Sequence, residues 1–198
     1  MKGASVGPNS SVGAMSVVNS AAELSWDVHV LERVTVGAGV VVGHATLFMH
    51  GAKICPDYVN RHSSDARKVS PMSTIGLGVD LHNEVELGPG AIVPSQRTIM
   101  HIGHFGSKNR VVTIYGSELG PRFSIGCQVG VDLDTIRDRV ANNSVSSPSS
   151  AGTYTPYLPM FDAVGRQVQD AYNQERDTIE YLMEYRQKLG LPIPAEVQ

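Results

Sequence analysis

The chain has 198 residues, of which 41% are hydrophobic and only 6% aromatic, so we expect one domain, or one domain with an appendage, built on aliphatic side chains. Lys and Arg total 16 against 19 Asp and Glu, and this net charge of −3 lacks the basic surplus that binds phosphate backbones, so no nucleic acid partner is expected. The sequence has neither an apolar stretch long enough to span a membrane nor the apolar core of a cleaved signal after Met1, so we expect no membrane partner and no export by such a signal.

An apolar residue recurs at every sixth position through the first half of the chain. The first run comprises Val6, Val12, Val18, Leu24, Val30, Val36, Val42, Phe48 and Ile54, and after an interruption the phase returns at Val69, Ile75, Leu81, Leu87, Val93 and Ile99. A small or β-branched residue usually follows four places later, and glycine often stands second in the hexad, as at Gly7, Gly13 and Gly43. No amphipathic helix has a sustained period of six.

This period is explained if each hexad forms one short strand and one corner, and if three hexads close a triangular coil. The apolar residue then points inward and stacks on its counterpart in the next coil, while glycine supplies backbone angles that other residues reach only with strain. Stacked coils pair strand on strand about 4.8 Å apart. The hexads therefore predict a parallel solenoid of about five coils, with Val36 in its core.

These repeats resemble the hexapeptide-repeat family of left-handed parallel β-helix proteins, from Val6 to about His104. The resemblance implies a left-handed β-helix and a homotrimer, because β-helices of this family usually assemble in threes. The family includes acyltransferases, γ-class carbonic anhydrases and proteins without known chemistry, so the fold alone does not choose among these functions.

The segment from Cys55 to Lys68 interrupts the repeat with polar residues and is expected to leave a corner as a loop. It carries His62 beside Arg61 and Asp65. In the acetyltransferases of the family, a protruding loop presents a histidine that acts as general base while coenzyme A lies between subunits. The resemblance extends to residues 75–90 with their Pro-Gly corner, and it implies a catalytic role for His62. An exposed histidine without a catalytic role is the other interpretation.

The remaining histidines raise the question of zinc, because γ-class carbonic anhydrases hold zinc between subunits with three imidazoles. His44, His50 and His101 share the third position of the hexad, whereas His29 and His104 share the sixth. Neighbouring hexads face different sides of the triangle, so His44 and His50 are expected to point about 120° apart, and no metal site is predicted within one chain. A ring of one histidine per chain on a threefold axis stays open.

After His104 the period changes from six to two, which divides the chain into a β-helix over 1–104 and a second module over 105–198. Two alternating segments, 110–116 and 122–128, predict a hairpin joined by the turn-rich residues 117–121. Asp132 is expected to cap a short helix with Leu133 and Ile136 on its apolar face. Residues 142–156 are predicted to be a linker, and residues 160–189 one long amphipathic helix, broken near Asn173 in an alternative interpretation.

This second module resembles a β-hairpin-plus-helix module that follows β-helical repeats in uncharacterised proteins of bacteriophages and bacteria. Its marks here include residues 106–108 and 113–115, the Gly126-Cys127 pair, and the helix beyond Tyr157. Cys127 has no companion histidine or acid in a recognisable position, so a small residue packed under the helix is expected. Cys55 and Cys127 lie far apart without CxxC spacing, which predicts two buried free thiols.

Two functions follow as hypotheses. The first is a non-enzymatic trimeric scaffold or binding protein, phage-encoded by resemblance, located in the virion or the cytoplasm, with itself and virion or host proteins as partners and no cofactor. The second is a coenzyme A-dependent acyltransferase that uses His62.

Overall fold

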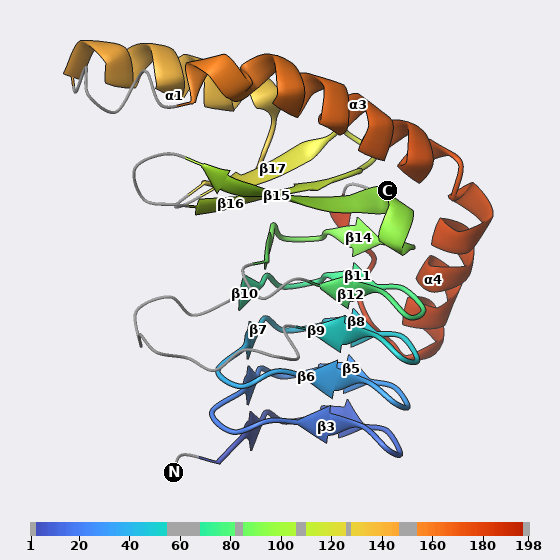
Figure 1. Cartoon of the computed structure of the whole chain (residues 1–198). Coiled ribbons are helices and arrows are strands. Elements are labelled where there is room, and N and C mark those ends of the chain that lie inside the picture. Colours follow the sequence, from blue (N-terminus) through green and yellow to red (C-terminus); the bar gives the residue numbers. More distant parts are fainter. Residues whose placement is uncertain are drawn as a thin grey trace.

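The computed structural model describes residues 3–54, 68–81, 85–105, 110–125, 128–146 and 154–195. Its first half consists of short strands stacked in coils (Figure 1). The strands are β1 (Ser5–Val6), β2 (Ser11–Val12), β3 (Val17–Val18), β4 (Glu23–Leu24), β5 (His29–Val30), β6 (Thr35–Val36), β7 (Val41–Val42), β8 (Leu47–Phe48), β9 (Lys53–Ile54), β10 (Lys68–Val69), β11 (Thr74–Ile75), β12 (Asp80–Leu81), β13 (Glu86–Leu87) and β14 (Ile92–Val93).

These strands form three parallel sheets, one for each side of a triangular solenoid. The strand orders are β1-β4-β7-β10-β13, β14-β11-β8-β5-β2 and β12-β9-β6-β3. The second residue of each strand pairs with its counterpart in the next coil, as Val6 does with Leu24 and Val18 with Val36. The predicted β-helix is therefore confirmed, with four complete coils and two strands of a fifth.

The interior of the solenoid is a stack of aliphatic side chains, as the hexads predicted. Leu24, Val30, Val36 and Ile54 are each exposed by 3% or less and belong to one core cluster. Ile99, the apolar residue of the fifteenth hexad, joins this cluster. It also begins β15 (Ile99–Phe105), so the chain enters an antiparallel sheet where a fifteenth parallel strand was expected.

The role assigned to the glycines that stand second in the hexad is corrected by the structure. The positive φ angles lie two residues further on, at corner positions such as Asn9, Asp27 and Arg33, and Gly7 and Gly43 are not among them. A Cβ atom at Gly43 would lie 2.3 Å from the backbone nitrogen of Pro71 in the next coil. Glycine is required at these positions because adjacent coils approach closely, and the left-handed angles fall mostly on other residues.

The predicted hairpin is confirmed and is part of a larger sheet of order β15-β16-β17-β18. The additional strands flank β16 (Arg110–Tyr115) and β17 (Arg122–Ile125), with β18 (Gln128–Val131) at the far edge. One face of the sheet packs on helices, with Val112, Ile114 and Phe123 of the sheet in one cluster with the helical residue Phe161. The other face covers the last coil, where Gly88 N donates to the Tyr115 hydroxyl at 3.0 Å. The C-terminal end of the β-helix is thus closed by the chain itself.

The helical part comprises η1 (Gln96–Thr98), α1 (Leu133–Ser146), η2 (Thr155–Tyr157), α3 (Leu158–Asn173) and α4 (Arg176–Lys188). Asp132 caps α1 as predicted, because its Oδ1 accepts from Thr135 N at 2.7 Å, and this bond lowers the pKa of Asp132. The prediction that a linker begins at residue 142 is wrong, since α1 continues to Ser146. The long C-terminal helix is broken, and α3 and α4 meet at Gln174 and Glu175.

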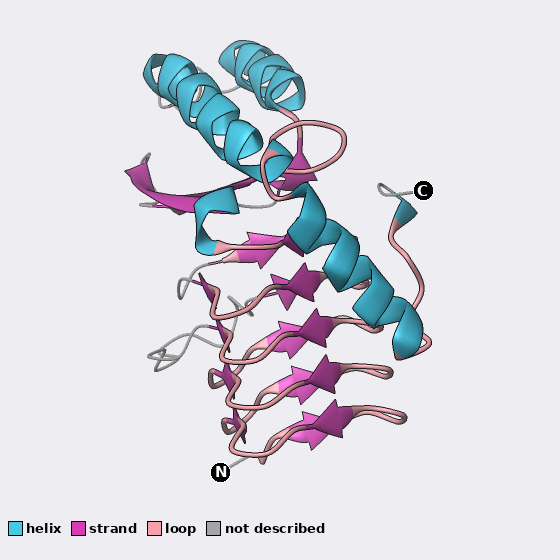
Figure 2. Ribbon diagram, turned by 90° about the vertical axis from the view of Figure 1, so that its right-hand side faces the viewer, coloured by secondary structure: helices cyan, strands magenta, loops and turns pink. Residues whose placement is uncertain are grey.

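The break lets the two helices serve different parts of the molecule. α3 lies on the antiparallel sheet, whereas α4 turns down along one side of the solenoid (Figure 2). On that side the outward residues Leu47 and Ile92 pack against Leu182 and Met183 of α4. A side of the β-helix that would otherwise expose apolar side chains is thereby covered by the chain's own helix.

Candidate functional site

His62, the residue proposed as a general base, lies outside the described residues, as do Cys55 and Cys127. His29, His44 and His50 take the positions that the repeat predicted, whereas the hexad positions expected for His101 and His104 are wrong, because the chain has left the solenoid there for an antiparallel strand. His44 and His50 lie in the turns before and after β8, which are different corners of the triangle, and His29 faces outward from β5. His101 and His104 lie in β15, and the side chain of His104 is outside the described part.

His44, His29 and His101 each contact a different neighbour. His44 stacks on Trp26 of the coil below, with ring centroids 4.4 Å apart and planes inclined by 2°. His29 Nδ1 lies 2.9 Å from the Ser11 hydroxyl, and His101 Nδ1 lies 3.3 Å from that of Thr113. Burial lowers the pKa of His29. Within the described ranges, no three His, Cys, Asp or Glu residues gather closely enough to hold a metal ion.

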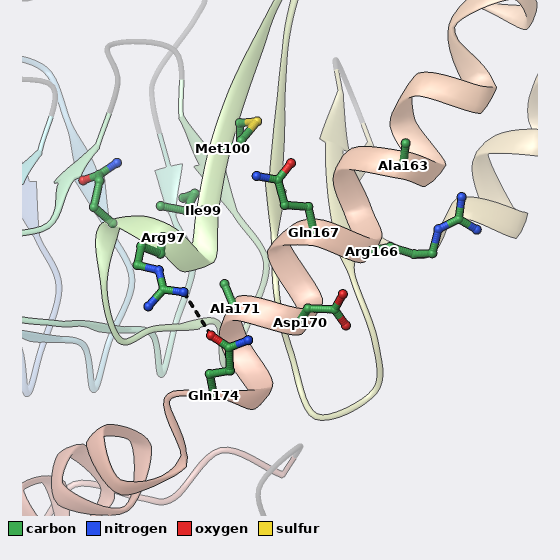
Figure 3. Close-up of a pocket in the computed structure, with 10 residues that line it drawn as sticks. Arg97, Ile99, Met100, Ala163, Arg166, Gln167, Asp170, Ala171 and Gln174 are labelled. Atoms are coloured by element: carbon green, nitrogen blue, oxygen red, sulfur yellow. Dashed lines mark hydrogen bonds between the residues drawn. The ribbon is translucent and has the colours of Figure 1, made fainter.

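Polar groups gather around an open groove of about 610 Å³ between α3 and the end of the β-helix (Figure 3). Buried or half-buried Ile99, Met100 and Ala171 contribute its apolar part. Its exposed residues come from η1 and from successive turns of α3, and they are Gln96, Arg97, Ala163, Arg166, Gln167, Asp170 and Gln174. Two guanidinium groups, three carboxamides and the carboxylate of Asp170 thus surround a small apolar surface.

Hydrogen bonds hold the groove's polar side chains in place. Arg97 Nη2 donates to Gln174 Oε1 at 2.9 Å, across the end of the groove where η1 meets the C-terminus of α3. Gln96 Oε1 accepts from Asp80 N at 2.8 Å, and Arg166 pairs with Asp162 one turn earlier in α3 at 2.8 Å. Guanidinium and carboxamide groups donate to carboxylates and to peptide carbonyls, so this arrangement suits the binding of a polar or acidic segment.

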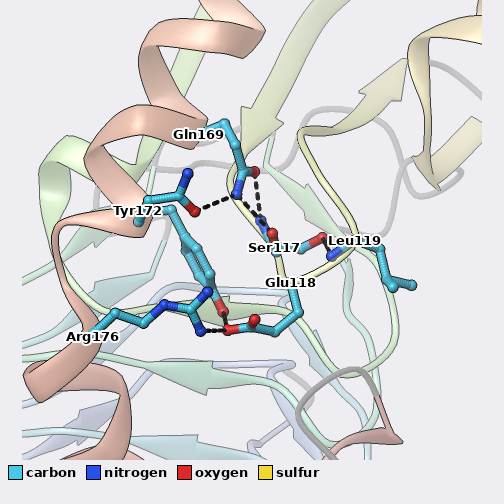
Figure 4. A network of polar contacts seen from close by, with 7 residues as sticks. Ser117, Glu118, Leu119, Gln169, Tyr172 and Arg176 are labelled. Atoms are coloured by element: carbon cyan, nitrogen blue, oxygen red, sulfur yellow. Dashed lines mark hydrogen bonds and ion pairs between the residues drawn. The ribbon is translucent and has the colours of Figure 1, made fainter.

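The wall formed by α3 is fastened on its other side by a polar network (Figure 4). Gln169 Nε2 donates to Ser117 O at 2.8 Å and its Oε1 accepts from Ser117 N at 3.1 Å, so one carboxamide satisfies both backbone groups of that residue. Arg176 Nη1 lies 2.6 Å from Glu118 Oε1, a hydrogen bond that raises the pKa of Arg176. These contacts fix the break between α3 and α4 against the loop 117–120.

A buried arginine fastens α4 to the solenoid. The side chain of Arg186 is fully buried, and its Nη1 donates to Ser73 O at 3.1 Å and to Thr74 Oγ1 at 2.9 Å. Its Nη2 donates to Ala45 O at 2.9 Å and to Pro192 O at 2.7 Å. Burial lowers the pKa of Arg186 to about 10, so the group stays charged at neutral pH. Helix α4, its C-terminal extension and two coils are joined by this one side chain.

The sequence prediction missed both the groove and Arg186. Only Arg186 left a signal, because it follows Leu182 and Met183 at helical spacing and therefore stands in an apolar stripe where a charge is unexpected. The groove residues left none, since Arg97 and Gln174 are ordinary surface residues until the tertiary fold brings them together.

No protein-family model matches the chain, and no curated protein is significantly similar to it in sequence. The hexapeptide-repeat and bacteriophage resemblances therefore stay predictions from the residue pattern, whereas the parallel β-helix is observed. None of the described helices is both long enough and apolar enough to cross a membrane.

Proposed function

We propose that the protein is a non-enzymatic trimeric scaffold that binds a partner protein in the groove between α3 and η1. The observation that carries this proposal is that the groove is preformed: Arg97 and Gln174 are bonded to each other, and the α3 wall is bonded to the loop 117–120. A preformed surface loses little conformational freedom when it binds. The expected partner is an acidic or amide-rich segment of a virion or host protein.

The rigidity of the β-helix supports the scaffold role. Its interior is filled by stacked aliphatic residues, and α4 is held across one side by Arg186. The groove is therefore carried on a rod that cannot easily change its shape. The two sides that α4 leaves uncovered present outward residues such as Glu23, Val41 and Lys53, and a side-by-side trimer would use these sides.

The groove is tested by affinity capture with matched variants. The double variant Ala163→Arg, Arg166→Glu fills the groove and reverses one charge, whereas Arg137→Glu reverses an exposed charge on α1, away from the groove. We expect a partner that is retained by the wild type and by Arg137→Glu to be lost from the double variant. A partner retained equally by all three proteins would contradict the assignment of the groove.

The acyltransferase hypothesis makes a different prediction for coenzyme A. A bound cofactor raises the melting temperature by mass action, and loss of a general base lowers a rate by about 10²- to 10⁴-fold. As a scaffold, the protein should show no shift in melting temperature with millimolar acetyl-coenzyme A. A clear shift that is lost in His62→Ala, but kept in the control His50→Ala at an exposed corner, would contradict the scaffold proposal.

A further inference from the structure

The two ends of the β-helix differ in how they are closed. At the C-terminal end the antiparallel sheet covers the last coil, and Tyr115 joins the core cluster of the solenoid. At the other end, the inward residues of the first coil are open to solvent: Val6 is 48% exposed and Val12 is 41% exposed. Their counterparts in the next coil, Leu24 and Val30, are 3% and 1% exposed. Within the described residues, nothing covers the apolar interior at this end.

The backbone at this end presents hydrogen-bonding groups in a regular arrangement. In the second coil, the carbonyls of Leu24, Val30 and Val36 point toward the first coil. They accept from Gly7 N, Gly13 N and Asn19 N at 2.9, 2.7 and 3.0 Å. By the same register, the carbonyl and N–H groups of Val6, Val12 and Val18 point away from the second coil. Each edge strand of the first coil therefore offers one residue with both a donor and an acceptor.

Within the described residues 3–22, the open end also lacks the features that normally protect strand edges from pairing. Such edges usually carry lysine or another charge, a proline within the strand, or a bulge. Residues 3–22 include no Asp, Glu, Lys, Arg or His, and Pro8 lies in a corner turn outside the strands. A partner for these residues must supply apolar side chains and strand edges.

We propose that this end docks on the same end of a second copy of the chain. A twofold axis perpendicular to the solenoid reverses the direction of the coil, so every edge strand meets an antiparallel strand. In an antiparallel hydrogen-bonded pair, two opposite residues exchange both of their N–H···O bonds. Such a junction requires, on each of the three edge strands, one residue whose N–H and carbonyl are both directed at the partner, and Val6, Val12 and Val18 meet this requirement. The valine stack then runs without a break from one copy into the other.

A second copy fits this end better than an unrelated partner for three reasons. It has a triangular coil of the same size, it presents the same three donor and acceptor pairs, and its residues 3–22 are equally free of charged side chains. The contact is isologous and closes as a pair. Growth into a filament is prevented because the opposite end of each copy is covered by the antiparallel sheet.

The first test is the mass of the assembly by light scattering. Val12→Lys places charges in the junction, whereas the control Ser11→Lys places the same charge on the outward face of the same strand, where Ser11 is exposed. We expect Val12→Lys to halve the mass of the wild-type assembly and Ser11→Lys to leave it unchanged, however many chains associate side by side. An equal mass for Val12→Lys and the wild type would overturn the proposal.

Disulfide cross-linking identifies the occupant as a second copy. In a background with Cys55 and Cys127 replaced by serine, Val6, Val12 and Val18 are changed singly to cysteine. A twofold junction sets one of these positions opposite itself and the other two opposite each other, at a Cα separation of about 5.5 Å that a disulfide can bridge. One variant should therefore cross-link alone, and the other two only when mixed. Absence of cross-links in every combination, or occupation of the end by a different protein, would overturn the proposal.

Discussion

Replacing Val36 by aspartate should unfold the β-helix or lower its stability by several kcal/mol. Val36 is fully buried, and it pairs with Val18 below and Ile54 above. A carboxylate at this position would lie among aliphatic side chains without a hydrogen-bond partner, and burying such a group is among the most damaging single changes. Urea denaturation followed by circular dichroism measures the loss.

The matched control for this experiment is Thr35→Asp. Thr35 precedes Val36 in β6, but its side chain faces outward beside Lys53 and is partly exposed. The same charge should therefore cost little there. If Val36→Asp melts at the wild-type temperature, the inward register of the hexads is wrong.

Replacing Arg186 by methionine should be the second most damaging change. It removes the hydrogen bonds by which the guanidinium group joins α4 to the solenoid. The carbonyls of Ala45 and Pro192 would then lose this donor, whereas Ser73 O would still accept from Leu47 N at 3.0 Å. Removing a buried arginine also removes its desolvation cost, which offsets part of the loss. Because an unsatisfied buried group costs about 1–3 kcal/mol, we expect a net destabilisation on the order of 3 kcal/mol.

Two further variants separate hydrogen bonding from charge. Lys188→Met removes an exposed positive charge from the end of the same helix and should change stability little. Arg186→Lys keeps the charge, but an ammonium group has three donors and lacks the planar fork, so it should recover only part of the loss. Equal unfolding free energies for Arg186→Met and the wild type would show that α4 is held by its apolar contacts alone.

The β-helix could be predicted from the sequence because its repeat is local and strict. Each inward residue pairs in the same register with its counterpart three hexads away, so one rule placed Val6, Val36 and Val93 alike on the inner face, although Val6 at the open end stays partly exposed. The corners were predicted less well, since the sequence does not distinguish a glycine needed for close approach, such as Gly43, from a residue with positive φ, such as Arg33. Both cases depend on how the coils stack, which the hexad does not specify.

The C-terminal module depended more on tertiary contacts. The apolar pattern from Phe161 to Leu189 runs at helical spacing, so it predicted one helix, and the alternative of a break near Asn173 is the one that the structure confirms. The structure turns at Gln174 and Glu175 because α3 follows the antiparallel sheet and α4 follows the solenoid. Glu175 is held there by Ser95, whose hydroxyl donates to it at 2.8 Å. The candidate groove arises from the same turn, and for this reason its residues could not be identified from the sequence.

The most direct test of the proposed trimeric scaffold is the mass of the Val12→Lys variant by light scattering at micromolar concentration. This variant removes the end-to-end contact and leaves the sides of the β-helix unchanged, so its mass reports side-by-side association alone. The proposal predicts three times the chain mass of 21.2 kDa. A mass equal to that of one chain would contradict it.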